Sequence, residues 1–438
     1  MVDAWLPYGK SDVCVRIPTR NYLGCLEPKE KAGAPDPHAE ILRALQEPLA
    51  SKRLCEIAKP ESKVAIVIDD DTRPAPSHLM IPPILDELKA AGTKDENITI
   101  IVACGTHKPI TREKMIGLLG EAIVNRVKTI NHDCKAPDLV KVGTTNRYGT
   151  EVFLNRTFEE ADVRIVTGDV CLHYYAGYGG GRKSILPGIA GEETIKHNHI
   201  MMLSPQSKTG NLIENPVHED MVEAARLTRV DFCLNVVMNS KHEIVKAFSG
   251  DVDKVFSEGV KLVDEMFRVQ VDRRADIVVV SPGGHPADVN LYQAYKAVDN
   301  ALEIVKRGGV IVLVAELPEG HGHQIFYDWM VKFQELKTVE REIKRNFTMG
   351  GAKAYLYLKA MQKATIILVS SMPDYYAATV FRLKTARAVN DALNQAFIIT
   401  EKNAKVWTMP FGSYTLPEVK APTEEGTQNA TVETPAAE

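Results

Sequence analysis

A glycine-rich stretch between Cys171 and Gly188 holds the densest group of reactive side chains in this sequence. It reads Cys-Leu-His-Tyr-Tyr-Ala-Gly-Tyr-Gly-Gly-Gly-Arg-Lys-Ser-Ile-Leu-Pro-Gly. Consecutive glycines let a backbone adopt unusual dihedral angles or approach a ligand closely. The adjacent cations Arg182 and Lys183 indicate that this ligand is anionic. A flexible surface loop is the plainer alternative, but such loops do not normally interleave tyrosines with glycines.

Two histidines each follow a segment that the sequence predicts to be a buried strand. His107 lies in Gly-Thr-His-Lys-Pro, and His173 lies in Cys-Leu-His-Tyr-Tyr. A single loop histidine is more often structural than catalytic, but two at the ends of parallel strands, beside Arg73 and Lys183, favour catalysis. Because imidazole titrates near neutral pH, such a pair could act as base and acid on opposite sides of a substrate. A racemase or an epimerase needs that symmetry.

The third reactive segment is Asp-Asp-Asp-Thr-Arg-Pro-Ala-Pro, residues 69–76. Its three carboxylates fit a solvated turn, a divalent cation site or acceptors for the hydroxyls of a ribose. We favour ribose contacts over magnesium because no other carboxylates cluster with them in the sequence. Arg73 offers the planar fork that recognises phosphate or carboxylate, although a surface ion pair is an equal alternative for one arginine.

The glycine-rich stretch fails as a P-loop. With Gly177 at the head of the G-x-x-x-x-G-K-[ST] pattern, Lys183 and Ser184 are in register, but Arg182 stands where the last glycine belongs. No G-x-G-x-x-G fingerprint opens a first βα unit. An ATP-dependent enzyme is therefore the weakest of the alternatives.

The elements that must position these groups follow an α/β pattern. The continuous β-branched runs 63–68, 98–104 and 163–170 predict buried parallel strands, and each is followed by one of the three motifs. In open α/β sheets, ligands bind outside the carboxyl ends of the strands, so we expect the three loops to converge. Between them the sequence predicts helices at 38–49 and 79–92 and a helix capped by Thr111.

A second α/β pattern starts at residues 275–281 and continues with a helix at 290–298. Further strands are expected at 309–315, 365–370 and 396–400. A chain of 438 residues exceeds the size at which a single core usually stops growing. We therefore predict an α/β fold of two domains, each with a mainly parallel sheet flanked by helices, and an active site in the cleft between them. The predicted limits are 1–270 for the first domain, 271–415 for the second and 416–438 for a disordered tail.

Composition excludes several classes of protein. Hydrophobic residues make up 45% and charged residues 25% of the chain, which is typical of globular proteins, and the net charge of −4 comes with no basic block. No apolar run approaches the roughly eighteen residues of a membrane span, and residues 1–6 lack the basic-then-apolar pattern expected of a signal peptide. The seven cysteines form no CxxC pair. We expect a cytoplasmic protein with reduced thiols that binds neither nucleic acid nor membranes.

Taken together, four motifs resemble the lactate racemase family, and they occur in the same order over most of residues 60–300. Such a resemblance implies a racemase or epimerase of a 2-hydroxy acid, lactate-like or larger, that depends on a nickel-pincer nucleotide (nickel pyridinium-3,5-bisthiocarboxylic acid mononucleotide) and on the proteins that mature this cofactor. The motifs are Asp-Asp-Asp-Thr-Arg-Pro-Ala-Pro (69–76), Gly-Thr-His-Lys-Pro-Ile-Thr (105–111), the stretch from His173 to Gly188, and Asn198-His199.

The resemblance also implies a role for individual residues. Lys183, next to Arg182, is the lysine that holds the cofactor, covalently as a thioamide in some members. His199 is the protein ligand to nickel, to which the cofactor adds a carbon and two sulfurs. His197, two residues away on a predicted helix at 191–203, faces roughly the opposite side. The remaining expected roles are acid/base catalysis by His107 and His173, nucleotide and substrate contacts by Asp70, Asp71, Thr72 and Arg73, and contacts to the substrate carboxylate or the cofactor phosphate by Gln293 and Lys296.

The implied reaction transfers a hydride. One histidine removes the hydroxyl proton while the α-hydrogen passes to the cofactor, and the planar 2-keto acid is then reduced on its other face while the second histidine returns the proton. The cofactor carries the difficult step, and the protein supplies orientation and proton transfer. The alternatives from other classes are a non-catalytic cofactor-binding protein and the ATP-dependent enzyme.

Overall fold

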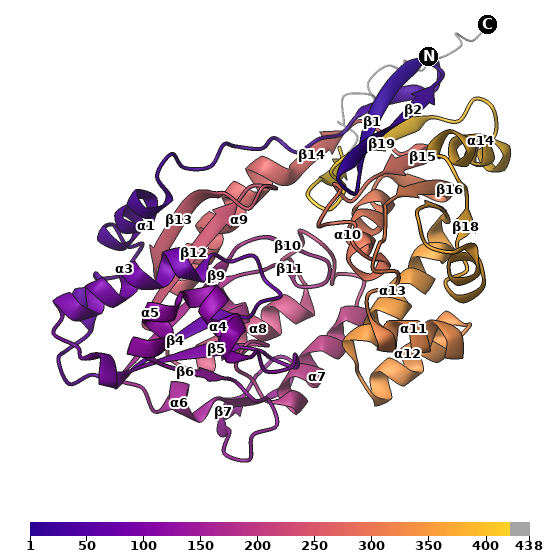
Figure 1. Cartoon of the computed structure of the whole chain (residues 1–438). Coiled ribbons are helices and arrows are strands. Elements are labelled where there is room, and N and C mark those ends of the chain that lie inside the picture. The colour runs from indigo at the N-terminus through magenta and orange to yellow at the C-terminus, as the bar shows by residue number, and fades with distance from the viewer. Residues whose placement is uncertain (421–438) are drawn as a thin grey trace, which may run out of the picture.

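The fold is built on two six-stranded sheets, and helices lie on both faces of each sheet (Figure 1). The computed structural model describes residues 1–420. Of the predicted disordered tail, residues 421–438 lie outside the described residues. The predicted fold class, α/β with two domains that each hold a mainly parallel sheet, is confirmed.

The first sheet has the strand order β13-β12-β9-β4-β5-β6 and is parallel except for the pair β12–β13. Side chains of β4 alternate between two cores. Ile66 and Ile68 pack with helices α1 (Pro37–Gln46) and α3 (Ser77–Ala90), whereas Ala65 and Val67 pack with α7 (Glu192–Ile200) and α8 (Pro216–Leu227). Burial on both faces explains the continuous β-branched runs. The strands are β4 (Val64–Asp69), β5 (Ile98–Ala103), β6 (Lys128–Asn131), β9 (Val163–Asp169), β12 (Phe232–Met238) and β13 (Ile244–Gly250).

The second sheet has the order β18-β17-β16-β15-β19-β3 and is parallel throughout. Val278 and Val280 of β15 pack with α10 (Leu291–Leu302) and α13 (Met349–Lys363) in the same hydrophobic cluster that contains Val67 of the first sheet. The two halves of the molecule therefore share one continuous core. The strands are β3 (Tyr22–Cys25), β15 (Ala275–Val280), β16 (Val305–Val314), β17 (Thr365–Val369), β18 (Lys384–Thr385) and β19 (Val406–Met409).

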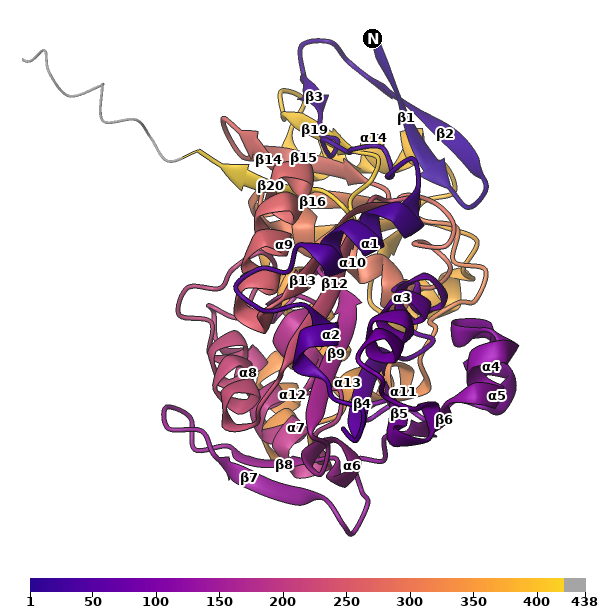
Figure 2. The same ribbon diagram turned by 90° about the vertical axis from the view of Figure 1, so that its left-hand side faces the viewer.

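Residues 1–25 belong with the second sheet, although the predicted domain limits assigned them to the first. Strand β3 pairs with β19, and the hairpin of β1 (Val2–Tyr8) and β2 (Ser11–Ile17) packs on the outer face of the second sheet beside α14 (Figure 2). Pairing between residues almost 400 positions apart leaves no local signal, so the sequence could not place this segment. The limit at residue 270 stays a prediction.

The helices follow the predicted positions closely in the first half of the chain. Thr111 caps α4 as expected, because its hydroxyl accepts a hydrogen bond from the Lys114 amide. No helix within residues 1–420 is long and apolar enough to cross a membrane. The helices are α1 (Pro37–Gln46), α2 (Leu54–Ile57), α3 (Ser77–Ala90), α4 (Arg112–Leu119), α5 (Glu121–Arg126), α6 (Arg156–Glu159), α7 (Glu192–Ile200), α8 (Pro216–Leu227), α9 (Val252–Phe267), α10 (Leu291–Leu302), α11 (Gln324–Lys332), α12 (Leu336–Arg345), α13 (Met349–Lys363) and α14 (Val389–Thr400).

The strand predicted at 396–400 is wrong, because these residues form the last turns of α14. A short apolar run such as Ala-Phe-Ile-Ile does not by itself distinguish a strand from a helix. The burial pattern does: Val389, Leu393 and Ala396 are buried at helical spacing, whereas Ile398 is 84% exposed. The strand lies further along, as β19.

The predicted tail begins too early. Leu416–Val419 form β20, which pairs in parallel with β14 (Arg268–Val271). Leu416 is buried. The low apolar content of the chain from Leu416 on does not indicate a strand. β20 is stabilised by pairing with β14, which lies almost 150 residues earlier.

Glutamate substitutions in α14 test its helical character. Ala396→Glu should lower the free energy of unfolding by roughly 3 kcal/mol, because it buries an unpaired charge. Ile398→Glu should change it by less than about 0.5 kcal/mol, because that side chain is exposed. In a strand the two positions would share a face and respond alike. Urea unfolding followed by circular dichroism measures both, and equal losses would contradict the helix.

Candidate active site

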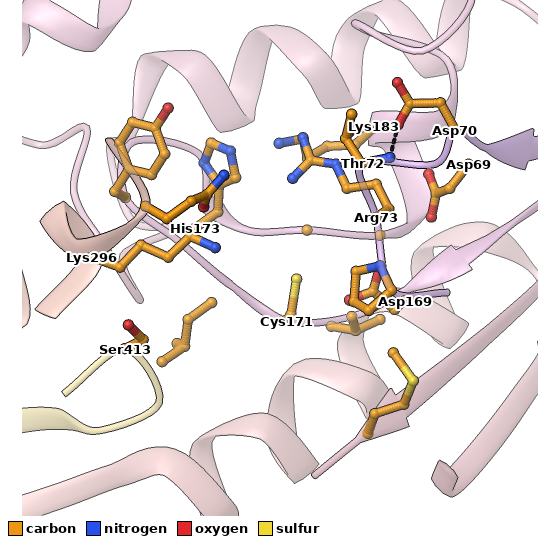
Figure 3. A pocket seen from close by; sticks show the side chains of 18 of the residues that line it. Asp69, Asp70, Thr72, Arg73, Asp169, Cys171, His173, Lys183, Lys296 and Ser413 are labelled. Carbon is orange, nitrogen blue, oxygen red and sulfur yellow. Dashed lines mark hydrogen bonds between the residues drawn. The ribbon is translucent and has the colours of Figure 1, made fainter. Parts of the chain in front are cut away.

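The loops at the carboxyl ends of β4, β5 and β9 meet the second half of the molecule around a cavity of about 570 Å³. A cavity of this size suits a small molecule or a nucleotide-like cofactor. Figure 3 shows side chains from the two halves of the chain extending into it, with Lys296 opposite Arg73. The expected convergence of the three strand-end loops is therefore confirmed.

Every site residue named from the sequence lines this one cavity. The first half of the chain contributes eight of them and α10 contributes two. They are Asp70, Asp71, Thr72, Arg73, His107, His173, Lys183, His199, Gln293 and Lys296. Their individual roles stay predictions.

Asp70 and His107 form a hydrogen-bonded pair between the ends of β4 and β5. Oδ2 of Asp70 lies 2.6 Å from Nδ1 of His107, and Oδ1 accepts the Thr72 hydroxyl at 2.6 Å. Burial alone would raise the pKa of Asp70, but the hydrogen bonds from His107 and Thr72 outweigh it and keep this pKa below its ordinary value. With Asp70 ionised, the His107 proton lies on Nδ1, and Nε2 is left with a free lone pair. Asp70, for which the sequence predicted a contact to the nucleotide, thus orients His107.

Asp71 contributes less than the sequence indicated. It lies at the rim of the cavity, and its carboxylate pairs with Lys114 of α4. This contact is a partly exposed ion pair of the kind that adds little stability.

His173 is held in the opposite way to His107. It sits in the two-residue pairing of β10 (Leu172–His173) with β11 (Gly177–Tyr178). Its Nδ1 accepts backbone N–H groups of Ala176 at 3.2 Å and Tyr175 at 3.5 Å, so the neutral ring carries its proton on Nε2. Burial and the charges of Lys183 and Arg73 hold the pKa of His173 well below its ordinary value.

Glycine is required at the two ends of the turn that follows His173. Gly177 has φ +75°, and a Cβ atom there would lie 2.4 Å from the carbonyl oxygen of Asn211. Gly180 has φ +78°, and its Cβ would lie 2.8 Å from the carbonyl oxygen of Asp169. Both positions combine left-handed backbone with contact to another segment, which only glycine tolerates.

Lys183 extends from the short 3₁₀ turn Gly181–Ser184 into the cavity. Burial and the nearby charges of Arg73 and Arg182 hold the pKa of Lys183 well below its ordinary value. A neutral amine is a nucleophile, so this lysine could form a covalent bond with a ligand.

His199 faces the cavity from α7, where it is 2% exposed. Its Nδ1 donates to Oδ1 of Asn198 at 3.1 Å, and the Asn198 amide donates in turn to Asp220. Burial and the charges of Lys183 and Arg73 lower the pKa of His199 to about 3. A neutral ring with an oriented Nδ1–H presents Nε2 as a metal ligand.

His197 lies on the other side of α7, as predicted. Its side chain is exposed, and its Nδ1 contacts the Thr150 hydroxyl at 2.7 Å. Among residues 1–420, no group of three or more His, Cys, Asp and Glu side chains could hold a metal ion. His199 is therefore not part of a larger group of metal-binding side chains within that range.

Arg182, the other cation of the glycine-rich stretch, does not line the cavity. The guanidinium is 2% exposed, turns away from the cavity and donates to the carbonyl oxygens of Ala176 and Gly180 at 2.9 and 3.1 Å. It also lies 4.1 Å from the ring centre of Phe256. Burial lowers its pKa to about 9. These hydrogen bonds from Arg182 stabilise the glycine-rich loop.

Arg73 and Lys296 approach the cavity from opposite halves of the molecule. Burial would lower the pKa of Arg73, but the charge of Asp69 raises it overall. Burial and the charge of Arg73 lower the pKa of Lys296. Gln293 lies one turn before Lys296 on α10, whose first turn is capped by Asn290. The arginine, the lysine and the amide together suit a carboxylate.

Sequence reasoning missed Asp169, the last residue of β9, which is 5% exposed and lines the cavity. Burial and the charge of Asp169 raise the pKa of Asp69 to about 7. Asp169 could have been identified from the sequence as a carboxylate at the end of a predicted buried strand, just before the glycine-rich stretch.

Comparisons with known proteins cover both halves of the chain. Residues 8–210 match the family model described as the lactate racemase N-terminal domain, and residues 270–415 match that of the lactate racemase C-terminal domain. The lactate racemase of Thermoanaerobacterium thermosaccharolyticum is 33% identical over 420 residues, which cover 94% of this chain and 98% of that protein. That of Lactiplantibacillus plantarum is 32% identical over 431 residues, covering 94% and 99%.

Solved structures agree with these matches. The lactate racemase apoprotein from T. thermosaccharolyticum superimposes with a TM-score of 0.88 at 31% identity, covering 95% of this chain and all of that one. A protein from Thermotoga maritima shares the fold with a TM-score of 0.63 at 21% identity, covering 89% of this chain and all of that one.

The two cavity histidines should carry their protons on opposite nitrogens. At about pH 8, where imidazole is neutral, long-range ¹⁵N–¹H spectra of histidine-labelled protein should show His107 with the proton on Nδ1 and His173 with it on Nε2. His107→Gln and His173→Gln assign the signals. Asp70→Ala should change the tautomer ratio of His107 alone. The same tautomer in both rings would contradict the hydrogen bonds described above.

Proposed function

The chain belongs to the lactate racemase family, whose members are isomerases, and we propose that it interconverts the stereoisomers of a 2-hydroxy acid with a nickel-pincer nucleotide. The substrate would be lactate or a larger 2-hydroxy acid. One observation carries the proposal: the ten site residues predicted from the sequence all line a single cavity between the two halves of the chain.

The residues around this cavity fit the cofactor. Lys183 has the lowered pKa that a covalent thioamide link to a lysine requires. His199 offers one imidazole, and the absence of a further metal-binding cluster within residues 1–420 agrees with a metal whose other ligands belong to the cofactor. When bound, the nickel-pincer nucleotide supplies a hydride acceptor for the α-hydrogen of the substrate.

The carboxylate of the substrate would be bound by Arg73 and Lys296, with Gln293 beside them. Both cations line the cavity. Because they come from opposite halves of the chain, substrate binding would also hold the two halves together and keep water from the planar 2-keto acid.

Proton transfer falls to the two histidines. His107 Nε2 takes the hydroxyl proton of one stereoisomer, and the Asp70 carboxylate, 2.6 Å from Nδ1, stabilises the imidazolium that forms. His173 serves the other stereoisomer. Before its Nε2 can accept a proton, the proton of the neutral ring must lie on Nδ1, so the long hydrogen bonds from the amides of residues 175 and 176 must open.

Nickel content and racemase activity together test the proposal. Protein made in a host with the cofactor maturation proteins should contain about one nickel per chain and interconvert at least one 2-hydroxy acid. Metal analysis by mass spectrometry and chiral chromatography on a panel of 2-hydroxy acids measure the two properties. Lys183→Ala should lose most of the nickel, whereas Lys196→Ala, a surface lysine of α7, should retain it. Nickel-loaded protein that converts no 2-hydroxy acid would refute the activity, and equal nickel in Lys183→Ala would refute the cofactor site.

Alanine variants of the histidines test the proton transfer. His107→Ala and His173→Ala should each lower kcat by about 10²- to 10⁴-fold, because each removes a general acid or base, while nickel content stays unchanged. His197→Ala is the matched control, since it removes an exposed histidine two residues from His199, and it should leave kcat unchanged. If the wild type binds the cofactor without turnover and all three variants behave like it, the protein is a cofactor-binding protein without this activity.

A further inference from the structure

Lys353 is a buried lysine that the proposed reaction does not use. It lies in the middle of α13, a helix buried on nearly every side, and is 2% exposed. Within the described part of the chain its ammonium forms neither an ion pair nor a hydrogen bond. Three tyrosine rings enclose it instead, with centres at 4.1 Å (Tyr174), 4.7 Å (Tyr292) and 4.6 Å (Tyr295). An ammonium enclosed by aromatic faces is stabilised by cation–π attraction, most strongly where water is absent.

This tyrosine cage joins the two halves of the molecule. Tyr292 and Tyr295 belong to α10 of the second half, whereas Tyr174 follows β10 in the first half. Burial and the charge of Lys296 lower the pKa of Lys353 to about 7, while the ring faces and Asp299 favour its charged form. Asp299 accepts a hydrogen bond from Thr209 of the first half at 2.7 Å, so a second contact also joins the two halves of the molecule.

The cage connects directly to a cavity histidine. The ring of Tyr174 stacks on His173 with 4.8 Å between centres and 13° between planes. Besides this stack, His173 makes an edge-on contact with the ring of Tyr175, with 4.5 Å between centres, and its Nδ1 accepts two long hydrogen bonds. The stack is therefore one of the contacts that orient this imidazole.

We propose that Lys353 is a positioning residue: its ammonium holds Tyr174 against His173 and so makes the orientation of the imidazole depend on the docking of the second half of the molecule. The catalytic consequence rests on the proposed function, but the positioning itself does not. Lys353 does not line the cavity, whereas Tyr174 and Met349, one turn earlier on α13, do. Lys353 thus acts on the site through Tyr174.

Histidine-labelled apoprotein tests the positioning without requiring activity. Lys353→Met keeps the length of the side chain and removes its charge. It should shift the ring signals of His173 and leave those of His107 in place. Lys359→Met is the matched control, because this exposed lysine on the same helix faces Tyr355 outside the cage at 5.9 Å, and it should leave both histidines unchanged.

Variants of Tyr174 keep the test decisive if Lys353→Met does not fold. Tyr174→Leu removes the stack and should displace the His173 signals, whereas Tyr174→Phe keeps an aromatic face and should hold them near their wild-type position. Lys353→Met combined with Tyr174→Leu should shift His173 no further than Tyr174→Leu alone, because both changes break the same chain of contacts.

In cofactor-loaded enzyme, Lys353→Met should lower kcat about tenfold or more, as expected for a displaced acid/base group, with KM changed less than about twofold. A loss of thermal stability with unchanged His173 signals and unchanged kcat would overturn the proposal and leave Lys353 a structural residue. A rise in KM alone would overturn it in favour of a substrate contact. If the wild type shows no racemase activity, the proposed function fails, and the spectra still decide the positioning.

Discussion

Burial, reinforced by the charge of Arg73, lowers the pKa values of the basic groups around this cavity. The charge of Arg73 contributes to the lowered pKa values of His173, Lys183, His199 and Lys296. Such surroundings favour the neutral forms of lysine and histidine more than water does. A neutral lysine is a nucleophile, and a neutral histidine is a metal ligand. An anionic cofactor and an anionic substrate would relieve the repulsion, so the same arrangement that tunes the groups also favours the ligands.

The two cavity histidines differ in their hydrogen bonds, although the proposed reaction is symmetric overall. His107 is anchored by a carboxylate, and His173 by backbone amides and by the ring of Tyr174. The proposed interconversion of two stereoisomers would require both rings to act as base and as acid, and they would enter that cycle from opposite tautomers. The anchor of His107 is Asp70, directly after β4 in the first half, whereas that of His173 extends through Tyr174 to Lys353 in the second half of the molecule.

The elements around the first sheet could be predicted because they are coded locally. Strands buried on both faces require continuous β-branched runs, and residues 63–68 and 98–104 have them. The rule that ligands bind at the carboxyl ends of parallel strands then brought His107, His173 and Arg73 together. Prediction failed where pairing is remote or composition is ambiguous: β3 and β20 find partners far along the chain, and 396–400 is apolar enough for either a strand or a helix.

The sequence by itself determined which residues gather at the cavity, because motif order and strand-end position are properties of the chain read locally. Only the tertiary structure decided what each side chain does there, since direction and burial depend on neighbours distant in sequence. Arg182 and Lys183 are adjacent cations. Arg182 donates a hydrogen bond to a carbonyl oxygen of its own loop, whereas Lys183 lines the cavity. Lys353 carries no motif at all. Its three tyrosines come from two segments at least 58 residues away from it, and packing alone brings them together.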